Sequence, residues 1–353
     1  MSTPSERFLI FYETSFALKK FKFSEYLNQE FVFKSPVKYQ VKYSSSPEIL
    51  LHSLCNAILK NLDSNPLFRP VAEQEFKELK FIRVYEAFYK AVEAAIFKVN
   101  CDENTLPKLI LLLHLSKTDL PTYIFEKYFQ RLDSLVIVNS DYDKISEYIT
   151  ELKKLYSKLI YSKNLRNFSI KAIRKINGLT SDIESMDISK IKLVFFNDQI
   201  FDLNGFSGID SIYVSLNGLV FLHDRINDKL NKDSKMIIMK LNFVRLIQNE
   251  MTNILFRGFA DDMNIPTTDI LNKENKIFQG PGILSEIERF GGRIDWVQSS
   301  YYLNIRICED YLQKIEADQD ENFDLVAANV EFDTDCSDCF LALDMVLPTV
   351  MYE

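Results

Sequence analysis

The chain has 353 residues, of which 47% are hydrophobic and 26% charged, and its formal net charge is -8. This length is enough for two domains, and the acidic balance argues against a surface that binds nucleic acid through its phosphates. No apolar run approaches the roughly 20 residues that a membrane-spanning helix needs, and the first residues lack the pattern of a secretory signal. The cysteines are sparse and odd in number, which favours a reducing compartment. We therefore expect a cytoplasmic protein.

The first half of the chain predicts a small β element followed by helices. Apolar and polar residues alternate over Glu30–Ser44, which is the period of a strand. From Pro47 onward the period becomes helical. The predicted elements are a strand over Phe8–Tyr12, a hairpin over Glu30–Ser44, and helices over Glu48–Leu62, Glu73–Val99, Pro107–Ser116, Pro121–Leu135 and Asp143–Tyr161. We assign residues 1–176 to this first domain.

Basic residues are concentrated over Lys153–Lys175. A surface for nucleic acid or anionic lipid is conceivable there. Because the chain as a whole is acidic, we expect a solvated helix face and no nucleic-acid partner. The residues are Lys153, Lys154, Lys158, Lys163, Arg166, Lys171, Arg174 and Lys175.

The polar residues 177–188 mark the expected joint, after which the period of two returns. Ile191–Phe196 and Asp210–Leu216 are predicted strands, and Leu219–His223 is expected to continue the sheet. Two glycine dipeptides in Phe201–Gly208 predict turns. After a polar connection, Leu241–Arg257 gives a long apolar helix pattern, for which Ser234 is the expected N-cap. Residues 189–315 are therefore predicted to form a second domain, with a small mixed sheet and a central helix.

The centre of this helix carries the pentad Asn249-Glu250-Met251-Thr252-Asn253. With histidine at both asparagine positions the pentad would read H-E-x-x-H, in which two imidazoles at i and i+4 grip a zinc ion and the glutamate activates zinc-bound water. Arg257 follows four residues later, and Glu286–Gly292 reads E-x-x-x-F-G-G. Through these residues the region Ile191–Leu303 resembles a family of zincin-like, HExxH-bearing eukaryotic proteins.

The resemblance implies a third zinc ligand near the start of the second segment, where this chain has Gly280 and no side chain. The amides of Asn249 and Asn253 are weak zinc ligands beside imidazole or thiolate. Without a metal-polarised water, Glu250 is a general base without a nucleophile. We therefore expect no metal and no cofactor, with Glu250 as a vestigial catalytic candidate. The motif positions are Asn249, Glu250, Asn253 and Glu286.

Two other interpretations of the helix stay open. In one, the pentad is a chance pattern in a helix unrelated to peptidases, and Glu250 faces water or pairs with Arg245 or Arg257. In the other, a set of oxygen donors holds calcium or magnesium, although no D-x-D-x-D-G loop supports it. That set would comprise Glu250, Asp261, Asp262, Glu286 and Glu288.

The strand before the motif helix supplies the expected binding residues. In zincins an edge strand above the cleft holds extended substrate by main-chain pairing. The strand in this place is Asp210–Leu216, so Ile212, Tyr213 and Val214 are predicted to bind a peptide segment.

Other candidate chemistry is sparse. Cys336 and Cys339 form a C-x-x-C without a second pair, and their acidic neighbours would raise a thiol pKa, so we interpret them as incidental thiols. His52 and His114 lie in apolar helical patterns. His223, followed by Asp224, could be an isolated catalytic base.

Residues 316–353 are predicted to form an acidic tail with an apolar end. Nine acidic residues over Glu316–Asp338 suit a strap that docks on a basic partner. Phe340–Met351 is apolar and is expected to pack on the body or on a partner.

These observations predict an α+β protein: a mostly helical N-terminal domain, a zincin-like domain and a tail. The leading functional hypothesis is a non-catalytic binding or scaffold protein, a pseudoenzyme whose former cleft holds a peptide, a partner segment or its own tail. A metal-dependent hydrolase with atypical ligands and a helical protein–protein adaptor unrelated to peptidases are the alternatives. The expected partner is a protein or peptide.

Overall fold

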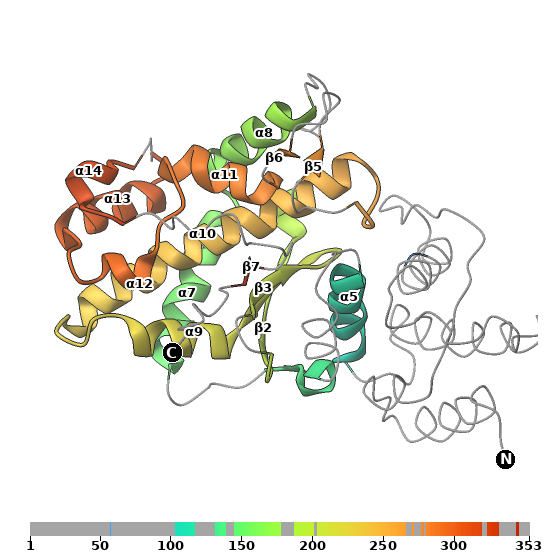
Figure 1. Cartoon of the computed structure of the whole chain (residues 1–353), viewed down its shortest axis with the longest axis horizontal. Coiled ribbons are helices and arrows are strands. Elements are labelled where there is room, and N and C mark those ends of the chain that lie inside the picture. The colour runs from blue at the N-terminus through green and yellow to red at the C-terminus, as the bar shows by residue number, and fades with distance from the viewer. Residues whose placement is uncertain are drawn as a thin grey trace, which may run out of the picture. The chain divides into compact units, whose positions relative to one another are not determined.

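A computed structural model describes residues 57, 103–116, 131–138, 145–177, 187–200, 203–265, 270–271, 277–278, 280–319, 323–331 and 344–345 (Figure 1). These residues fall into two compact units. The first holds Ala57 and residues 103–116, 131–137, 198–200 and 261–265, and the second holds the other described residues. The predicted elements at Phe8–Tyr12, Glu30–Ser44 and Glu73–Val99 lie outside the described residues. So does the predicted helix at Glu48–Leu62, apart from Ala57, which is helical and buried.

The first unit contains helix α5 (Thr105–Ser116), which confirms the helix predicted over Pro107–Ser116. Its residues from Leu109 to Leu113 are all buried. The 3-10 helix η2 (Leu132–Ser134) and the short strand β1 (Val136–Ile137) follow in the chain. The amide of Gln199 donates to Ser134 Oγ at 2.7 Å, which ties residues 198–200 to this unit.

A small mixed sheet forms one side of the second unit. Its strands are β2 (Lys192–Asn197), β3 (Leu203–Ser207), β4 (Ser211–Ser215) and β7 (Asp344–Met345), in the spatial order β2-β4-β3-β7. β4 runs parallel to β2 and antiparallel to β3, and β3 runs antiparallel to β7. The rings of Phe206 and Tyr213 stack on neighbouring strands with their centroids 4.7 Å apart. The predicted strands at Ile191–Phe196 and Asp210–Leu216 are thereby confirmed.

Two predictions next to these strands are wrong. Phe201–Gly208 does not turn throughout, because Leu203–Ser207 is strand β3. A Cβ at Gly205 would lie 2.6 Å from Tyr213 O and 3.2 Å from Leu246 Cδ1, so the glycine permits close packing instead of marking a turn. Leu219–His223 is not a strand but part of helix α9 (Leu216–Arg225), whose N-cap Ser215 accepts a hydrogen bond from Gly218 N.

The long helix α10 (Lys232–Phe259) is the element on which the second unit is assembled. It contacts β3 and β4 as well as α7, α8, α9, α11 and α13. Figure 1 shows α10 crossing this unit with the sheet on one side and α8 and α11 on the other. The surrounding helices are α7 (Ser146–Leu159), α8 (Lys163–Asn177), α11 (Pro281–Phe290), α12 (Trp296–Ser299), α13 (Ile305–Glu316) and α14 (Leu325–Ala328). The strands β5 (Ile270–Leu271) and β6 (Ile277–Phe278) pair with each other in an antiparallel two-stranded sheet.

The predicted domain boundary near residues 177–188 differs from the division of the described residues. Helices α7 and α8 belong to the second unit, and both contact α10. The apolar face of α7 is buried at Ile149, Leu152 and Leu155. An amphipathic pattern shows that a helix packs on something but does not identify its partner, so the sequence placed these helices with the preceding ones.

The described part of the predicted tail packs on the second unit. Phe323 is buried against Phe290 and Tyr311, with its ring centroid 4.7 Å from that of Tyr311. The amide of Asn304 donates to Ala328 O at 2.9 Å. Residues 323–331 are therefore part of the folded body instead of a mobile strap. Within the described ranges, no helix is both long and apolar enough to cross a membrane.

Candidate functional site

Helix α10 carries the motif pentad in a fully surrounded stretch. The helix begins after Asn231, whose side chain accepts a hydrogen bond from Ser234 N at 2.8 Å, so Asn231 is the N-cap in place of the predicted Ser234. Its 28 residues span about 42 Å at 1.5 Å per residue. Every residue from Phe243 to Arg257 is buried. The pentad therefore lies in the interior instead of on a surface face of the helix.

One stripe of α10 faces the sheet. Leu246 packs against Gly205 of β3, and Arg257 Nη1 donates to Ser207 Oγ at 2.7 Å at the end of the same strand. Glu250 lies four residues after Leu246 and Asn253 lies four residues before Arg257. Residues at this spacing share a helical face, so Glu250 and Asn253 lie between two residues that contact β3.

The first asparagine of the pentad is pressed against α11. A Cβ at Gly282 would lie 2.0 Å from Asn249 Oδ1 and 3.0 Å from Asn249 O. Any larger residue at Gly282 would therefore displace both the side chain and the main chain of Asn249. The position that would hold the first imidazole of a zinc site is filled by a helix–helix contact.

The second asparagine turns toward the first. Asn253 Nδ2 donates to Asn249 Oδ1 at 3.1 Å and lies 3.5 Å from Glu250 Oε2. Within the described part of the chain, Asn253 Oδ1 is buried and has no hydrogen-bond partner. Glu250 itself is fully buried. The amide pair thus occupies the i and i+4 positions with a hydrogen bond to each other.

Glu286, the fourth predicted motif position, lies on α11 and is also buried. Its Oε2 lies 3.4 Å from Nη1 of Arg245, which is one turn before the pentad. Glu286 on α11 therefore lies against α10, the helix that carries the other motif residues. It is held there by an ion pair with a buried arginine.

A hydrogen-bonded network joins α8, α10 and α11 beside the pentad. Gln248 Oε1 accepts from Arg289 Nη1 at 2.9 Å, while Gln248 Nε2 donates to Leu165 O at 3.1 Å and to Ser169 Oγ at 2.9 Å. Thr252 Oγ1 donates to Gln248 O at 2.7 Å and lies 2.8 Å from Ser285 Oγ. All five side chains of the network, those of Ser169, Gln248, Thr252, Ser285 and Arg289, are 0% exposed. Buried networks of this kind are costly when a member is lost, because the remaining groups keep their desolvation penalty.

No role was expected for these network residues from the sequence. Gln248 and Thr252 share a face four residues apart, and Gly282 and Ser285 are three apart on α11. These spacings can be seen in the sequence and indicate a polar face on each helix. The sequence does not show which helices meet at these faces, because that depends on the packing of α8 and α11 on α10.

The residues around the pentad do not fit the zinc that the resemblance implies. Two of the three ligand positions carry amides and the third, Gly280, is the N-cap of α11 with no side chain to offer. Neutral amide oxygens are weak zinc donors. In the described residues, no group of three or more His, Cys, Asp or Glu side chains is placed to hold a metal ion.

The predicted binding strand is an interior strand. β4 pairs with β2 on one side and with β3 on the other, so its main chain is not an open edge for an added strand. Ile212, Tyr213 and Val214 are all buried. Burial raises the pKa of Tyr213 to about 12. The expected pairing of an extended peptide with β4 is therefore wrong for this arrangement, because the sequence order of strands does not reveal which strand forms the edge.

The other candidates stand apart from the motif. His223 lies near the end of α9, where its ring meets Tyr148 edge-on at 5.1 Å and its Nδ1 lies 3.2 Å from Asp224 Oδ1. His114 is buried in α5 of the first unit. Asp261 and Asp262 also belong to the first unit. His52, Cys336 and Cys339 lie outside the described residues.

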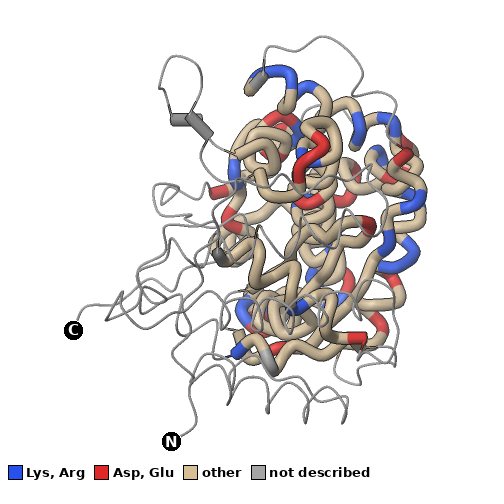
Figure 2. Tube along the Cα trace, turned by 90° about the vertical axis from the view of Figure 1, so that its right-hand side faces the viewer, with Lys and Arg blue, Asp and Glu red and all other residues tan. Residues whose placement is uncertain are grey.

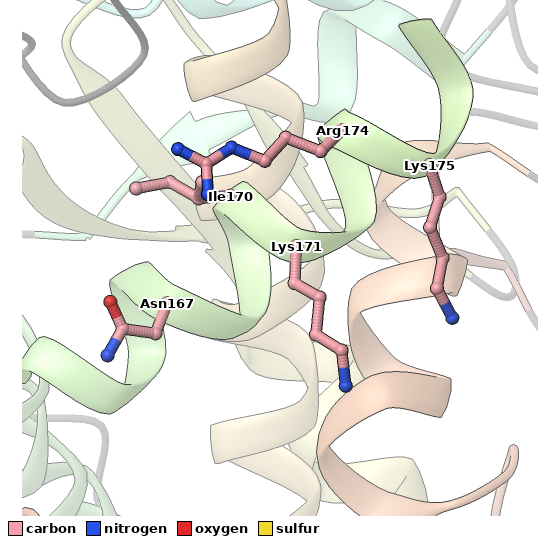
Figure 3. A pocket seen from close by; sticks show the side chains of 5 residues that line it. All are labelled: Asn167, Ile170, Lys171, Arg174 and Lys175. Carbon is pink, nitrogen blue, oxygen red and sulfur yellow. The ribbon is translucent and has the colours of Figure 1, made fainter. Parts of the chain in front are cut away.

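The basic stretch lies on α7 and α8. Lys171 and Lys175 of α8 both pair with Glu288 of α11, Lys171 at 2.5 Å, and Lys158 of α7 pairs with Glu316 at 2.6 Å. Figure 2 shows that Lys and Arg positions are interspersed with Asp and Glu positions along the described chain. A hollow of about 530 Å³ follows α8 (Figure 3). Its lining residues are Asn167, Ile170, Lys171, Arg174 and Lys175, spaced along one stripe of the helix.

Comparison with known proteins gives no match. No family model matches the chain, and neither the curated proteins nor the solved structures contain a match.

Proposed function

We propose that this protein is a non-catalytic binding or scaffold protein, built on a metallopeptidase-like arrangement whose motif helix has become part of the core. The observation that carries the proposal is the contact of Asn249 with Gly282. It fills the place of a first zinc ligand with a close approach of two helices. A metallopeptidase needs that place for an imidazole and an open coordination position beside it for water.

The burial of the remaining motif residues supports the same proposal. Glu250 and Asn253 are 0% and 2% exposed, and Glu286 is 1% exposed and paired with Arg245. A general base must come within hydrogen-bond reach of the proton that it removes from a substrate or water. Side chains that are buried in helix contacts are suited to holding α10 and α11 together.

The proposed partner is a protein or peptide, and the proposed compartment is the cytoplasm. Cys308 is a buried free thiol on α13, and its burial raises its pKa to about 12. A thiol of that kind reacts slowly, because the thiolate is the reactive form. A buried thiol that stays reduced at Cys308, the one cysteine among the described residues, is in keeping with a reducing compartment.

Metal analysis of the purified full-length chain tests the non-catalytic part of the proposal. We expect well under one zinc per chain after dialysis, and the same value for Glu250→Gln and for Asn249→Ala. Stoichiometric zinc that is lost in Asn249→Ala, while circular dichroism shows a folded protein, would favour the metal-dependent hydrolase.

Partner recovery from the native source tests the binding part. We expect the wild-type chain and Glu250→Gln to recover the same partner in equal amount. Structure determination of the complex then identifies the binding surface. A peptide-cleaving activity that Glu250→Gln abolishes without unfolding the protein would overturn the proposal. Recovery of no specific partner by either chain would also count against it.

A further inference from the structure

Three large apolar side chains are exposed on the segment from α12 to α14. Tyr301 is 56% exposed, Tyr302 63% and Val326 90%. The two tyrosines are consecutive, with ring centroids 6.5 Å apart. In the described part of the second unit, Tyr161 is the only other large hydrophobic residue that is exposed. We call Tyr301, Tyr302 and Val326 the tyrosine edge.

The tyrosine edge is held together by main-chain contacts. Asn329, in a left-handed conformation with φ 54°, caps α14, and its Nδ2 donates to Tyr302 O at 2.9 Å. Its own amide donates to Val326 O at 3.1 Å. One residue therefore bonds the carbonyls of both Tyr302 and Val326, so the two backbone segments that carry the tyrosine edge are held next to each other. Exposed aromatic groups that are held in place lose little conformational freedom on binding.

The segment that carries the tyrosine edge is acidic. Residues 295–319 and 323–331 include seven acidic residues and two basic ones, Arg306 and Lys314. Asp295 and Asp324 cap helices α12 and α14. The exposed acidic residues are Glu309, Asp310, Glu331 and the capping residue Asp324, and both basic residues are exposed as well. The exposed residues of this segment therefore carry a net negative charge, which favours a cationic partner over phosphates or anionic lipid.

We infer that the tyrosine edge docks a basic, arginine- or lysine-containing segment of a partner protein. Guanidinium and ammonium groups bind over tyrosine faces, and the apolar stems of the same side chains cover apolar surface such as Val326. The exposed carboxylates steer the segment toward the edge and pair with its remaining charges. This inference rests on the proposed binding function and names the chemistry of the partner.

The test uses the full-length chain and two fluorescein-labelled peptides of equal length. One alternates arginine with leucine and alanine, and the other replaces each arginine with glutamate. We expect the arginine peptide to bind, more weakly as salt is raised, and the glutamate peptide not to bind. The double variant Tyr301→Ser, Tyr302→Ser is expected to weaken binding about tenfold, and Val326→Ser by about threefold.

Tyr161 provides the matched control, because it is 72% exposed and lies between α7 and α8, where lysines are concentrated. Tyr161→Ser should leave peptide affinity within about twofold of wild type. Equal weakening by Tyr161→Ser, unchanged binding in the double variant, or binding of a single-stranded oligonucleotide in place of the arginine peptide would overturn the inference. If the double variant still recovers the native partner in full, the inference fails while the proposed binding function stands.

Discussion

The junction of α10 with α11 and the outer surface of α7 and α8 contain similar residue types in opposite settings. At the junction, Arg289 and Glu286 are almost completely buried and each has a defined partner. On the outer surface, the side chains of Lys158, Lys171 and Lys175, which pair with Glu316 and Glu288, remain more than half exposed. Charge in the sequence therefore does not reveal its role. Buried polar groups fix how the helices pack, whereas exposed ion pairs mainly keep the surface solvated.

The largest expected effect comes from Gly282→Ala. The added Cβ would lie 2.0 Å from Asn249 Oδ1, so the unfolding free energy should fall by about 3 kcal/mol, as overpacking of a core does. Alanine favours helix over glycine, which makes any loss a packing effect. Urea denaturation measures the change.

A double-mutant cycle with Asn249→Ala sharpens this prediction. Removal of the amide should restore part of the loss but not all of it, because Asn249 O also lies 3.0 Å from the new Cβ. Additive effects of the two substitutions would mean that the helices do not meet at this point.

Gln248→Leu should be the next most damaging change. It removes an acceptor from the buried Arg289 guanidinium and a donor from Leu165 O, and we expect a loss of about 2 kcal/mol in unfolding free energy. The same substitution at exposed Gln313 of α13 is the control and should change stability by less than about 0.5 kcal/mol. Equal effects at both positions would remove the distinction between junction and surface.

Asp318 gives an intermediate case with a pH dependence. Its partial burial raises its pKa. Hydrogen bonds from Ser162 Oγ and from the amides of Asn164 and Lys163 lower the pKa by more than burial raises it, so the pKa lies below its ordinary value of 3.8. A carboxyl group whose pKa is lower in the folded than in the unfolded protein stabilises the fold at pH values above the unfolded pKa. That contribution is lost as the pH falls through the folded pKa.

We therefore expect Asp318→Asn to cost about 1 kcal/mol near pH 7, as loss of a helix cap does, and to lose less stability than wild type when the pH is lowered from 5 to 3. Asparagine also accepts the left-handed conformation at this residue, φ 54°, so the backbone is not a confounding factor. Thermal unfolding at several pH values, with Asp310→Asn as the exposed control, measures both effects. Parallel pH curves for the variant and wild type would contradict the assignment.

The smallest effect is expected from Glu288→Gln. This carboxylate, whose side chain is 8% exposed, pairs with both Lys171 and Lys175, whose side chains are 61% and 55% exposed. Because both lysines reach water, salt screens the two pairs, so the loss should stay below about 1 kcal/mol and shrink in 1 M salt. A larger, salt-independent loss would place this pair with the junction instead of the surface.

Much of the second unit could be predicted from the periodicity of its apolar residues, and the wrong predictions have identifiable causes. The helices over Asp143–Tyr161 and Leu241–Arg257 and the strands β2 and β4 follow their apolar spacing. β3 was missed because Gly205 was interpreted through its backbone freedom, although the approach of the main-chain oxygen of Tyr213 is what requires a glycine there. The run Leu219–Leu222 is too short to separate strand from helix, and the Ser215 cap was the available signal for α9.

The candidate site was predictable only in part. Spacing alone places Asn249, Glu250 and Asn253 near one another on a helix, and the structure places Glu286 on the helix packed against them. Spacing does not say what covers a helical face. The contact with Gly282, the burial of Glu250 and the interior position of β4 depend on tertiary packing that no local pattern encodes.

The central position of α10 has a consequence during synthesis. The helices α7, α8 and α9 that contact it precede it in the chain, while α11 and α13 follow it. When α10 has just left the ribosome, the growing chain still lacks the cover that α11 and α13 provide, until residue 316 has left the exit tunnel. During that interval its apolar residues are open to other nascent chains. The yield of protein in the cell should therefore depend on holding chaperones, in a way that the equilibrium stability of the finished fold does not report.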